Sequence, residues 1–98
     1  MIEVNNKHDL ENQLKKSKRV LALFYASWCP YCKSFLATFD KTIMKRNFEC
    51  VLRINVDDYD NLLWEDYSIE AVPTVILFDE GRVCRWLDGR LGEWLESI

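Results

Sequence analysis

Val20-Leu21-Ala22-Leu23-Phe24-Tyr25 is an apolar run with no charged side chain to mark a solvent-facing side. Successive side chains of a strand point to opposite faces of its sheet, so this run predicts a strand that is buried on both faces. Two further segments rich in branched aliphatic residues, 51–57 and 75–78, predict additional strands. Such strands need a covering layer on each side, which favours an α/β fold.

Helical patterns alternate with these strands. Leu10 and Leu14 repeat at helical spacing, and the preceding Asn5 and Asn6 are good N-cap residues. Helices are predicted at about 7–16, 29–45 and 61–66, and a closing helix carries Leu91, Trp94 and Leu95. Further strands are predicted at 2–4 and, after a turn at 79–82, at 83–87.

The resulting order, βαβαβαββα, predicts parallel strands joined by crossover helices, followed by an antiparallel hairpin. We therefore expect residues 1–98 to form a single domain with a central mixed sheet and helices on both faces. The chain is 49% hydrophobic, which is enough apolar material for a core in a domain of this size.

Charge and hydropathy exclude several classes of partner. The formal net charge is −3, which argues against nucleic acid and anionic membranes as partners. No apolar run is long enough to cross a bilayer, and no apolar stretch typical of a signal peptide follows Met1. We expect a monomer in the cytoplasm, where thiols are kept reduced.

The segment Cys29-Pro30-Tyr31-Cys32 lies between a buried strand and a helix, where open α/β sheets place their sites. With Cys29 at the N-cap, Pro30 becomes the first helical residue, a position that suits proline. The Cys29 sulfur would then face the backbone N–H of Cys32 and the positive end of the helix dipole. Both interactions favour the thiolate of Cys29.

This spacing predicts different roles for the two thiols. Cys32 lies one helical turn after Cys29, within bridging distance but less exposed. Cys29 would attack a substrate disulfide, and Cys32 would then attack Cys29 and release the reduced substrate. Half of a zinc site is the alternative, but Cys50, Cys84 and His8 are not paired at ligand spacing. We therefore expect no metal and no cofactor.

Two separated segments resemble the thioredoxin family. Residues 24–33 are similar to its active-site segment, and residues 67–78 with Gly81 are similar to the segment that carries its cis-proline. The resemblance covers nearly the whole chain. It implies that Pro73 is cis and faces the Cys29 sulfur, and that the Val72 backbone pairs with an extended substrate. The implied catalytic residues are Cys29, Cys32 and Pro73, and the implied substrate contacts are Trp28, Pro30, Tyr31, Val72 and Gly89.

The chain also departs from the usual thioredoxin pattern. Pro30-Tyr31, the pair found in glutaredoxins, replaces Gly-Pro between the cysteines. Leu23 stands in the place of a buried aspartate, Arg53 in the place of a lysine, and Ala37 in the place of a proline that kinks the helix. These changes concern the redox potential and the proton path, while the reaction class is unaffected. The family's strand order also implies that Cys50 and Cys84 lie too far apart to bridge.

Three functions remain open from the sequence. We favour a reductase of protein disulfides, which would act on disulfide-containing proteins and take electrons from a reductase of the thioredoxin-reductase type or another donor. A glutathione-dependent reductase is disfavoured, because Asp88-Gly89-Arg90-Leu91-Gly92 lacks the Gly-Gly-Asp loop of glutaredoxins. A binding module without activity would not need both cysteines.

Overall fold

The computed structural model describes residues 2–43 and 50–88, and its eight elements follow the predicted order as far as that part of the chain reaches. The strands are β1 (Ile2–Val4), β2 (Arg19–Tyr25), β3 (Cys50–Asn55), β4 (Thr74–Asp79) and β5 (Arg82–Asp88). The helices are α1 (Lys7–Lys16), α2 (Pro30–Ile43) and α3 (Leu63–Asp66). The predicted closing helix and Gly89 lie outside the described residues.

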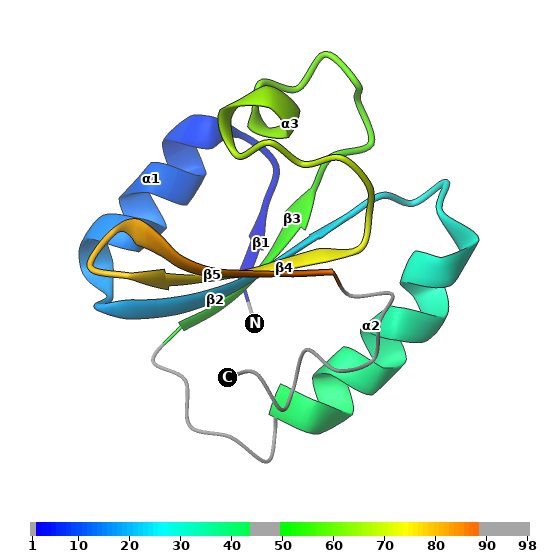
Figure 1. Ribbon diagram of the computed structural model, residues 1–98, viewed down its shortest axis with the longest axis horizontal. Coiled ribbons are helices and arrows are strands. Elements are labelled where there is room, and N and C mark those ends of the chain that lie inside the picture. Colours follow the sequence, from blue (N-terminus) through cyan, green and yellow to red (C-terminus); the bar gives the residue numbers. More distant parts are fainter. Residues whose placement is uncertain (1, 44–49, 89–98) are drawn as a thin grey trace.

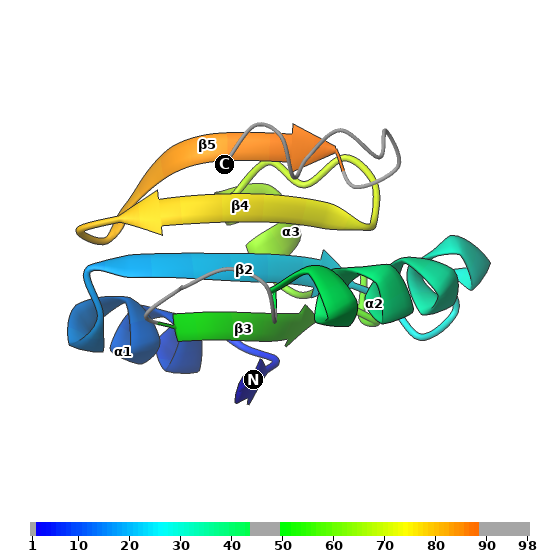
Figure 2. The same cartoon turned by 90° about the horizontal axis from the view of Figure 1, so that it is seen from below.

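The five strands form one mixed sheet in the order β1-β3-β2-β4-β5. Strand β3 is parallel to both β1 and β2, whereas β4 is antiparallel to β2 and to β5. Figure 2 shows β5, β4, β2 and β3 side by side, and β2 is the central strand of the sheet, between β3 and β4. The predicted parallel front and antiparallel hairpin are therefore confirmed.

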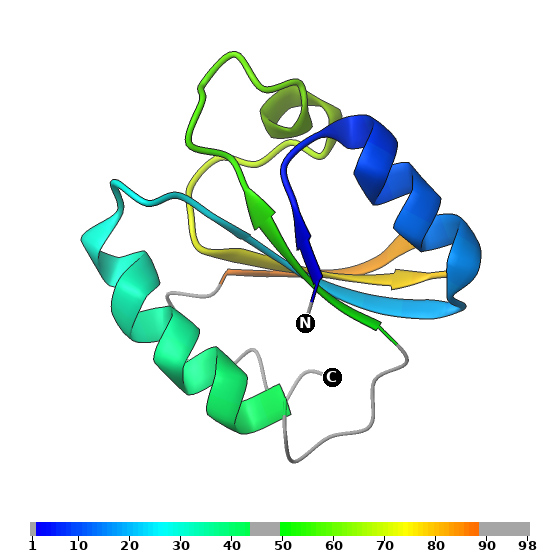
Figure 3. The same ribbon diagram turned by 180° about the vertical axis from the view of Figure 1, so that it is seen from behind.

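Helices cover both faces of the sheet, as the buried strands require. α1 and α3 lie on one face and α2 lies on the other (Figure 1), and the view from behind gives the same layering (Figure 3). Side chains of β2 alternate between two apolar clusters: Ala22 and Phe24 pack in the cluster that includes Leu10 and Leu63, and Leu21 packs in the other cluster. Residues 20–25 are all buried, as predicted.

Local sequence explains where the helices begin. The side chain of Asn6 caps α1, because its Oδ1 accepts a hydrogen bond from the backbone N–H of Asp9 at 2.9 Å. The Oδ1 of Asn61 accepts from the backbone N–H of Leu63 at 3.0 Å, at the start of α3. No helix in the described part of the chain has the length and apolar character to cross a membrane.

Candidate active site

Three chain segments meet at the carboxyl end of β2. The connection from β2 to α2 carries Cys29, and Cys32 follows in the first turn of α2. This connection lies beside the segment that enters β4 and the segment that leaves β3 (Figure 1). The backbone N–H of Cys29 donates to the carbonyl oxygen of Ala26 at 3.3 Å, and α2 begins at the next residue, Pro30. Proline suits this first position because its missing N–H would have no partner within the helix.

The predicted contact between the two cysteines is present. The backbone N–H of Cys32 donates to Cys29 Sγ at 3.2 Å. Cys29 keeps 8% of its surface exposed, whereas Cys32 keeps 1%. Both are free thiols, so the structure describes the reduced dithiol. A thiol that a substrate can reach, with a second and more deeply buried thiol one helical turn away, has the geometry for disulfide exchange.

Cys29 also contacts the segment that leads into β4. Its thiol donates to the carbonyl oxygen of Val72, with 3.7 Å between sulfur and oxygen. The Val72–Pro73 peptide bond is cis, as the resemblance implied. Both residues are buried, and the hydroxyl of Thr74 closes the turn by donating to the carbonyl oxygen of Ala71 at 2.6 Å. The motif and the cis-proline, more than 40 residues apart in the sequence, are thus neighbours.

The buried thiol of Cys32 resists ionisation. Burial raises the pKa of Cys32 to about 12, and its hydrogen bond with Cys29 adds to the shift. A hydrogen bond from the backbone of Ala26 acts in the opposite direction but is outweighed. Cys32 therefore keeps its proton at neutral pH in the reduced protein, which fits the role of a resolving thiol that reacts second.

Asp57, which was not among the predicted site residues, anchors the loop before Cys29. Its carboxylate accepts from the backbone N–H of Ser27 at 2.5 Å and from the Ser27 hydroxyl at 2.5 Å. These hydrogen bonds lower the pKa of Asp57, so the group is ionised at neutral pH. Its position two residues after the end of β3, a strand parallel to β2, was the signal that could have revealed it.

The predicted substrate contacts surround the cysteines. Trp28 and Tyr31 have 47% and 48% of their surfaces exposed, and Pro30 is exposed as well. The indole N–H of Trp28 donates to the carbonyl oxygen of Asp57 at 3.0 Å. Gly89, the remaining predicted contact, lies outside the described residues. The assignment of these residues to substrate binding stays a prediction.

Leu23 and Arg53, two departures from the usual family pattern, are neighbours across β2 and β3. Leu23 is fully buried. The Arg53 guanidinium lies 5.2 Å from the centre of the Tyr25 ring, and its buried Nε has no hydrogen-bond partner. The Tyr25 hydroxyl donates to the carboxylate of Glu3 on β1. Leu23 and Arg53 are therefore neighbours, as the aspartate and the lysine at these two positions would be in the usual family pattern.

The other two cysteines are separate from this site. Cys50 is buried on β3 and Cys84 is exposed on β5, with β2 and β4 between these strands. The prediction that they do not bridge is confirmed. Within residues 2–43 and 50–88, no group of three histidine, cysteine or acidic side chains is placed to hold a metal ion.

Comparison with known proteins agrees with the geometry of the site. The family model described as Thioredoxin matches residues 1–97. A thioredoxin of Mycoplasmoides gallisepticum is 32% identical over 92 residues, which is 94% of this chain and 88% of that protein. Protein disulfide-isomerase A5 of Bos taurus is 33% identical over 99% of this chain, but the match spans only 20% of that longer protein.

A solved structure supports the same fold. Thioredoxin f2 of Chlamydomonas reinhardtii superposes with a TM-score of 0.86, covering 100% of this chain and 93% of that chain at 18% identity. This likeness establishes the architecture, and the family model together with the mycoplasma relative establishes the family. The chain therefore belongs to the thioredoxin family of thiol–disulfide oxidoreductases.

Proposed function

We propose that this protein reduces disulfide bonds in other proteins, with Cys29 as the attacking thiol and Cys32 as the resolving thiol. The observation that carries the proposal is the placement of the Cys29 sulfur between the Cys32 N–H and the Val72 carbonyl. A donor at the helix start stabilises the thiolate. The backbone beside cis-Pro73 offers a polar edge to which an extended substrate can add as a strand.

The reaction proceeds by two exchanges. The Cys29 thiolate attacks one sulfur of the substrate disulfide, so that a bond from Cys29 to the substrate forms as the substrate S–S bond breaks. The released substrate thiolate takes a proton from water. Cys32 then loses its proton to water and attacks Cys29 Sγ, so that the Cys29–Cys32 bond forms as the bond from Cys29 to the substrate breaks. The second substrate thiolate leaves and takes a proton from water. Two electrons pass to the substrate, and the Cys29–Cys32 disulfide remains.

The other predicted residues have supporting roles in this proposal. Pro73 shapes the backbone that faces Cys29, and Val72 pairs with the substrate backbone. Trp28, Pro30, Tyr31 and Gly89 contact the substrate around the disulfide. A reductase, of the thioredoxin-reductase type or another, returns two electrons to the dithiol. The cytoplasm, where such donors keep thiols reduced, stays the predicted location.

Trapping distinguishes the roles of the two thiols. Cys32→Ser should accumulate a mixed disulfide with insulin, because nothing then resolves it, and Cys29→Ser should form none. Cys84→Ser, a change on the exposed far strand, serves as the matched control and should turn over like the wild type. Mass spectrometry of the quenched reaction measures the adduct. Trapping by Cys29→Ser in place of Cys32→Ser would reverse the assignment.

The same preparation tests the class of substrate. With dithiothreitol as donor, the wild type should accelerate insulin reduction and show little activity on a mixed disulfide of glutathione and a small thiol. The reason is that its sequence lacks the Gly-Gly-Asp loop typical of glutaredoxins. Efficient turnover of the glutathione substrate with slow insulin reduction would instead identify a glutathione-dependent enzyme.

A further inference from the structure

Large apolar side chains are exposed around Cys29. Four of the six that are exposed in the described part of the chain belong to segments 28–31 and 59–62, which flank the site. Tyr59 has 71% of its surface exposed and Trp28 has 47%. Their rings are stacked with 5.2 Å between centroids, and Trp64 stacks on Tyr59 at 5.4 Å. We call Trp28, Tyr59 and Trp64 the aromatic platform.

Hydrogen bonds fix the two indoles of this platform. The indole N–H of Trp28 donates to the carbonyl oxygen of Asp57, and that of Trp64 donates to the carbonyl oxygens of Val56 and Asp58, each at 3.1 Å. The polar atoms of the indoles are therefore already satisfied by the protein. What the platform offers to a partner is the face of an aromatic ring, which attracts apolar groups and cations.

Acidic side chains predominate around the platform. From Ile54 to Pro73, the part of the chain before β4, there are six carboxylates and neither lysine nor arginine. Asp57, Asp58 and Asp60 lie within four residues of one another and line a hollow of about 450 Å³ beside the platform. The one cation that lines this hollow, Lys7, is in a 3.0 Å ion pair with Asp66. The surface beside Cys29 is thus both aromatic and acidic.

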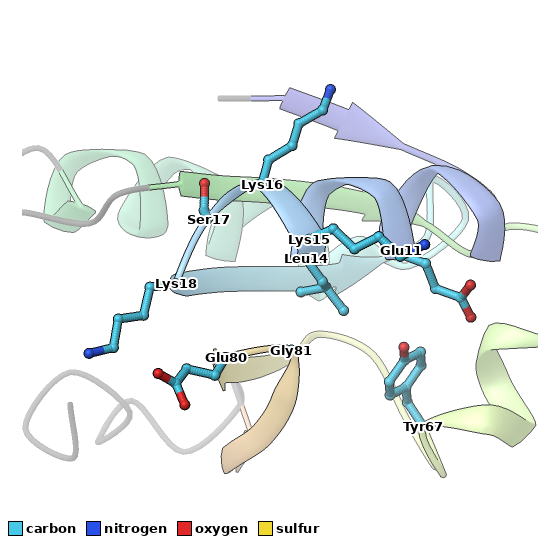
Figure 4. A pocket seen from close by; sticks show the side chains of 9 residues that line it. All are labelled: Glu11, Leu14, Lys15, Lys16, Ser17, Lys18, Tyr67, Glu80 and Gly81. Atoms are coloured by element: carbon cyan, nitrogen blue, oxygen red, sulfur yellow. The ribbon is translucent and has the colours of Figure 1, made fainter.

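A second hollow lies at the opposite end of the sheet, between the end of α1 and the turn after β4 (Figure 4). It is lined by Lys15, Lys16 and Lys18 together with Glu11 and Glu80. The side chains of Lys16 and Lys18 point away from each other (Figure 4), so they form no joint anion site. Carboxylates therefore outnumber lysine in the hollow beside the platform, whereas lysines outnumber carboxylates in the hollow at the other end.

We propose that the protein selects disulfides flanked by lysine or arginine, whose cationic side chain lies against the aromatic platform between Asp58 and Asp60. The proposal rests on the proposed function, since the disulfide is reduced by the same Cys29 and Cys32 exchange. A cation over an aromatic face is stabilised by the ring, and nearby carboxylates add attraction and speed the encounter. The same carboxylates repel phosphates, so the partner is a basic protein segment and not a nucleic acid.

Two synthetic peptides with the same disulfide test this preference. One has lysine and arginine on both sides of the disulfide, and the other has glutamate at the same positions. The fully reduced protein is mixed with each peptide, quenched with acid, and the rate constant of peptide reduction is measured by chromatography. The basic peptide should react about tenfold faster at low salt. The difference should shrink at high salt, because ions screen exposed charges.

Charge variants locate the effect. Asp58→Asn with Asp60→Asn should remove most of the preference, by slowing the basic peptide and accelerating the acidic one. Asparagine retains the oxygen of Asp58 that accepts from the backbone N–H of Asp60, so the loop geometry is preserved. The matched control, Glu11→Gln with Glu80→Gln, changes the net charge equally at the opposite end and should preserve the preference.

The ring contribution is tested at Tyr59. Tyr59→Phe retains an aromatic face and should keep the preference, whereas Tyr59→Ala should reduce it severalfold. Equal rates for both peptides in the wild type, or an equal loss of preference in the two charge variants, would overturn this inference and leave the proposed function intact. Reduction of neither peptide would overturn the proposed function, and this inference with it.

Discussion

Cys32 is the thiol whose ionisation limits the second half of the reaction. Its attack on Cys29 requires the thiolate, yet burial raises its pKa to about 12 in the reduced protein. The usual family pattern has a buried aspartate at the position of Leu23, which could take this proton. Leucine cannot, so we expect loss of the proton to be the slow part of resolution.

Leu23→Asp tests this expectation at the residue itself. The new carboxylate would adjoin Arg53, whose Nε lacks a partner, and could accept the proton of Cys32. Resolution of the mixed disulfide should be faster by about tenfold or more. The reduction potential should become more negative, because a nearby carboxylate opposes the thiolate of the reduced form. Single-turnover kinetics and equilibration with glutathione measure the two quantities.

Leu23→Asn is the matched control. Both substitutions place a polar group in an apolar cluster, and each should lower the free energy of unfolding by about 2–4 kcal/mol. Only aspartate supplies a base. Equal resolution rates in the two variants, measured where urea titration shows both to be folded, would show that a base at this position does not matter.

At the residue scale, local sequence patterns predicted the contacts between residues that are close together in the chain. The contact from the Cys32 N–H to the Cys29 sulfur follows from a three-residue spacing at a helix start. The anchoring of Ser27 by Asp57 and the stacking of Trp28 on Tyr59 join residues about 30 positions apart. Such contacts depend on where two strands end in space, and no local spacing encodes them.

The hairpin between β4 and β5 shows how an element depends on its turn. Asp79 pairs with Arg82, which leaves Glu80 and Gly81 as the two turn residues. Their φ angles are 54° and 81°, both in the left-handed region. Two-residue hairpin turns with positive φ at both positions match the twist of the strands and favour asparagine followed by glycine. Glutamate at the first position is therefore unfavourable for this turn.

Substitutions in this turn should change stability in opposite directions. Glu80→Asn should raise the free energy of unfolding by about 0.5 kcal/mol, because asparagine adopts positive φ more readily. The backbone N–H of residue 80 donates to the carbonyl oxygen of Lys18, and this hydrogen bond does not depend on the side chain that is replaced. Gly81→Ala should lower stability by about 1 kcal/mol through backbone strain alone, since an added Cβ would meet no atom within 4 Å. Urea denaturation measures both. A destabilising Glu80→Asn would contradict this reading of the turn.

The exact ends of strands and helices could not be predicted from hydrophobic periodicity. The predicted strand at 51–57 ends at Asn55, because Asp57 turns its carboxylate to Ser27 instead of continuing the ladder. The helix predicted from position 61 begins at Leu63, and the side chain of Asn61 accepts a hydrogen bond from the backbone N–H of Leu63. In both cases a polar side chain forms a hydrogen bond that ends or delays the regular structure, an effect that hydrophobic periodicity does not register.

For the molecule as a whole, the order of strands and helices along the chain was enough to predict most of the architecture. Alternating strands and helices followed by a hairpin permit few right-handed arrangements, and the observed sheet is one of them. The gathering of carboxylates at the dithiol end was harder to predict. It arises because β3, α3 and the segment entering β4, all within residues 50–79, lie close together around one end of β2.

Reduced protein should lose stability in alkaline solution through Cys32. In the folded state the pKa of this thiol is raised to about 12, whereas an unfolded cysteine has a pKa of about 8.5. Between these values the folded state retains a proton that the unfolded chain has lost. Its contribution to stability is thus complete below about pH 8.5 and declines as pH rises through the folded pKa. Through this one proton, the free energy of unfolding cannot fall by more than about 1.4 kcal/mol per pH unit.

Cys32→Ala isolates this contribution. Burial also raises the pKa of Tyr25 and Tyr67. Both tyrosines therefore also make the free energy of unfolding fall as pH rises, and they do so in every variant. The informative quantity is the difference between reduced wild type and Cys32→Ala in urea titrations at several pH values from 8 upward. Reduced wild type should lose stability more steeply with rising pH. The oxidised protein should resemble the alanine variant, because its disulfide holds no proton to lose. Parallel curves for the reduced wild type and Cys32→Ala would mean that the buried thiol ionises as easily in the folded protein as in the unfolded chain.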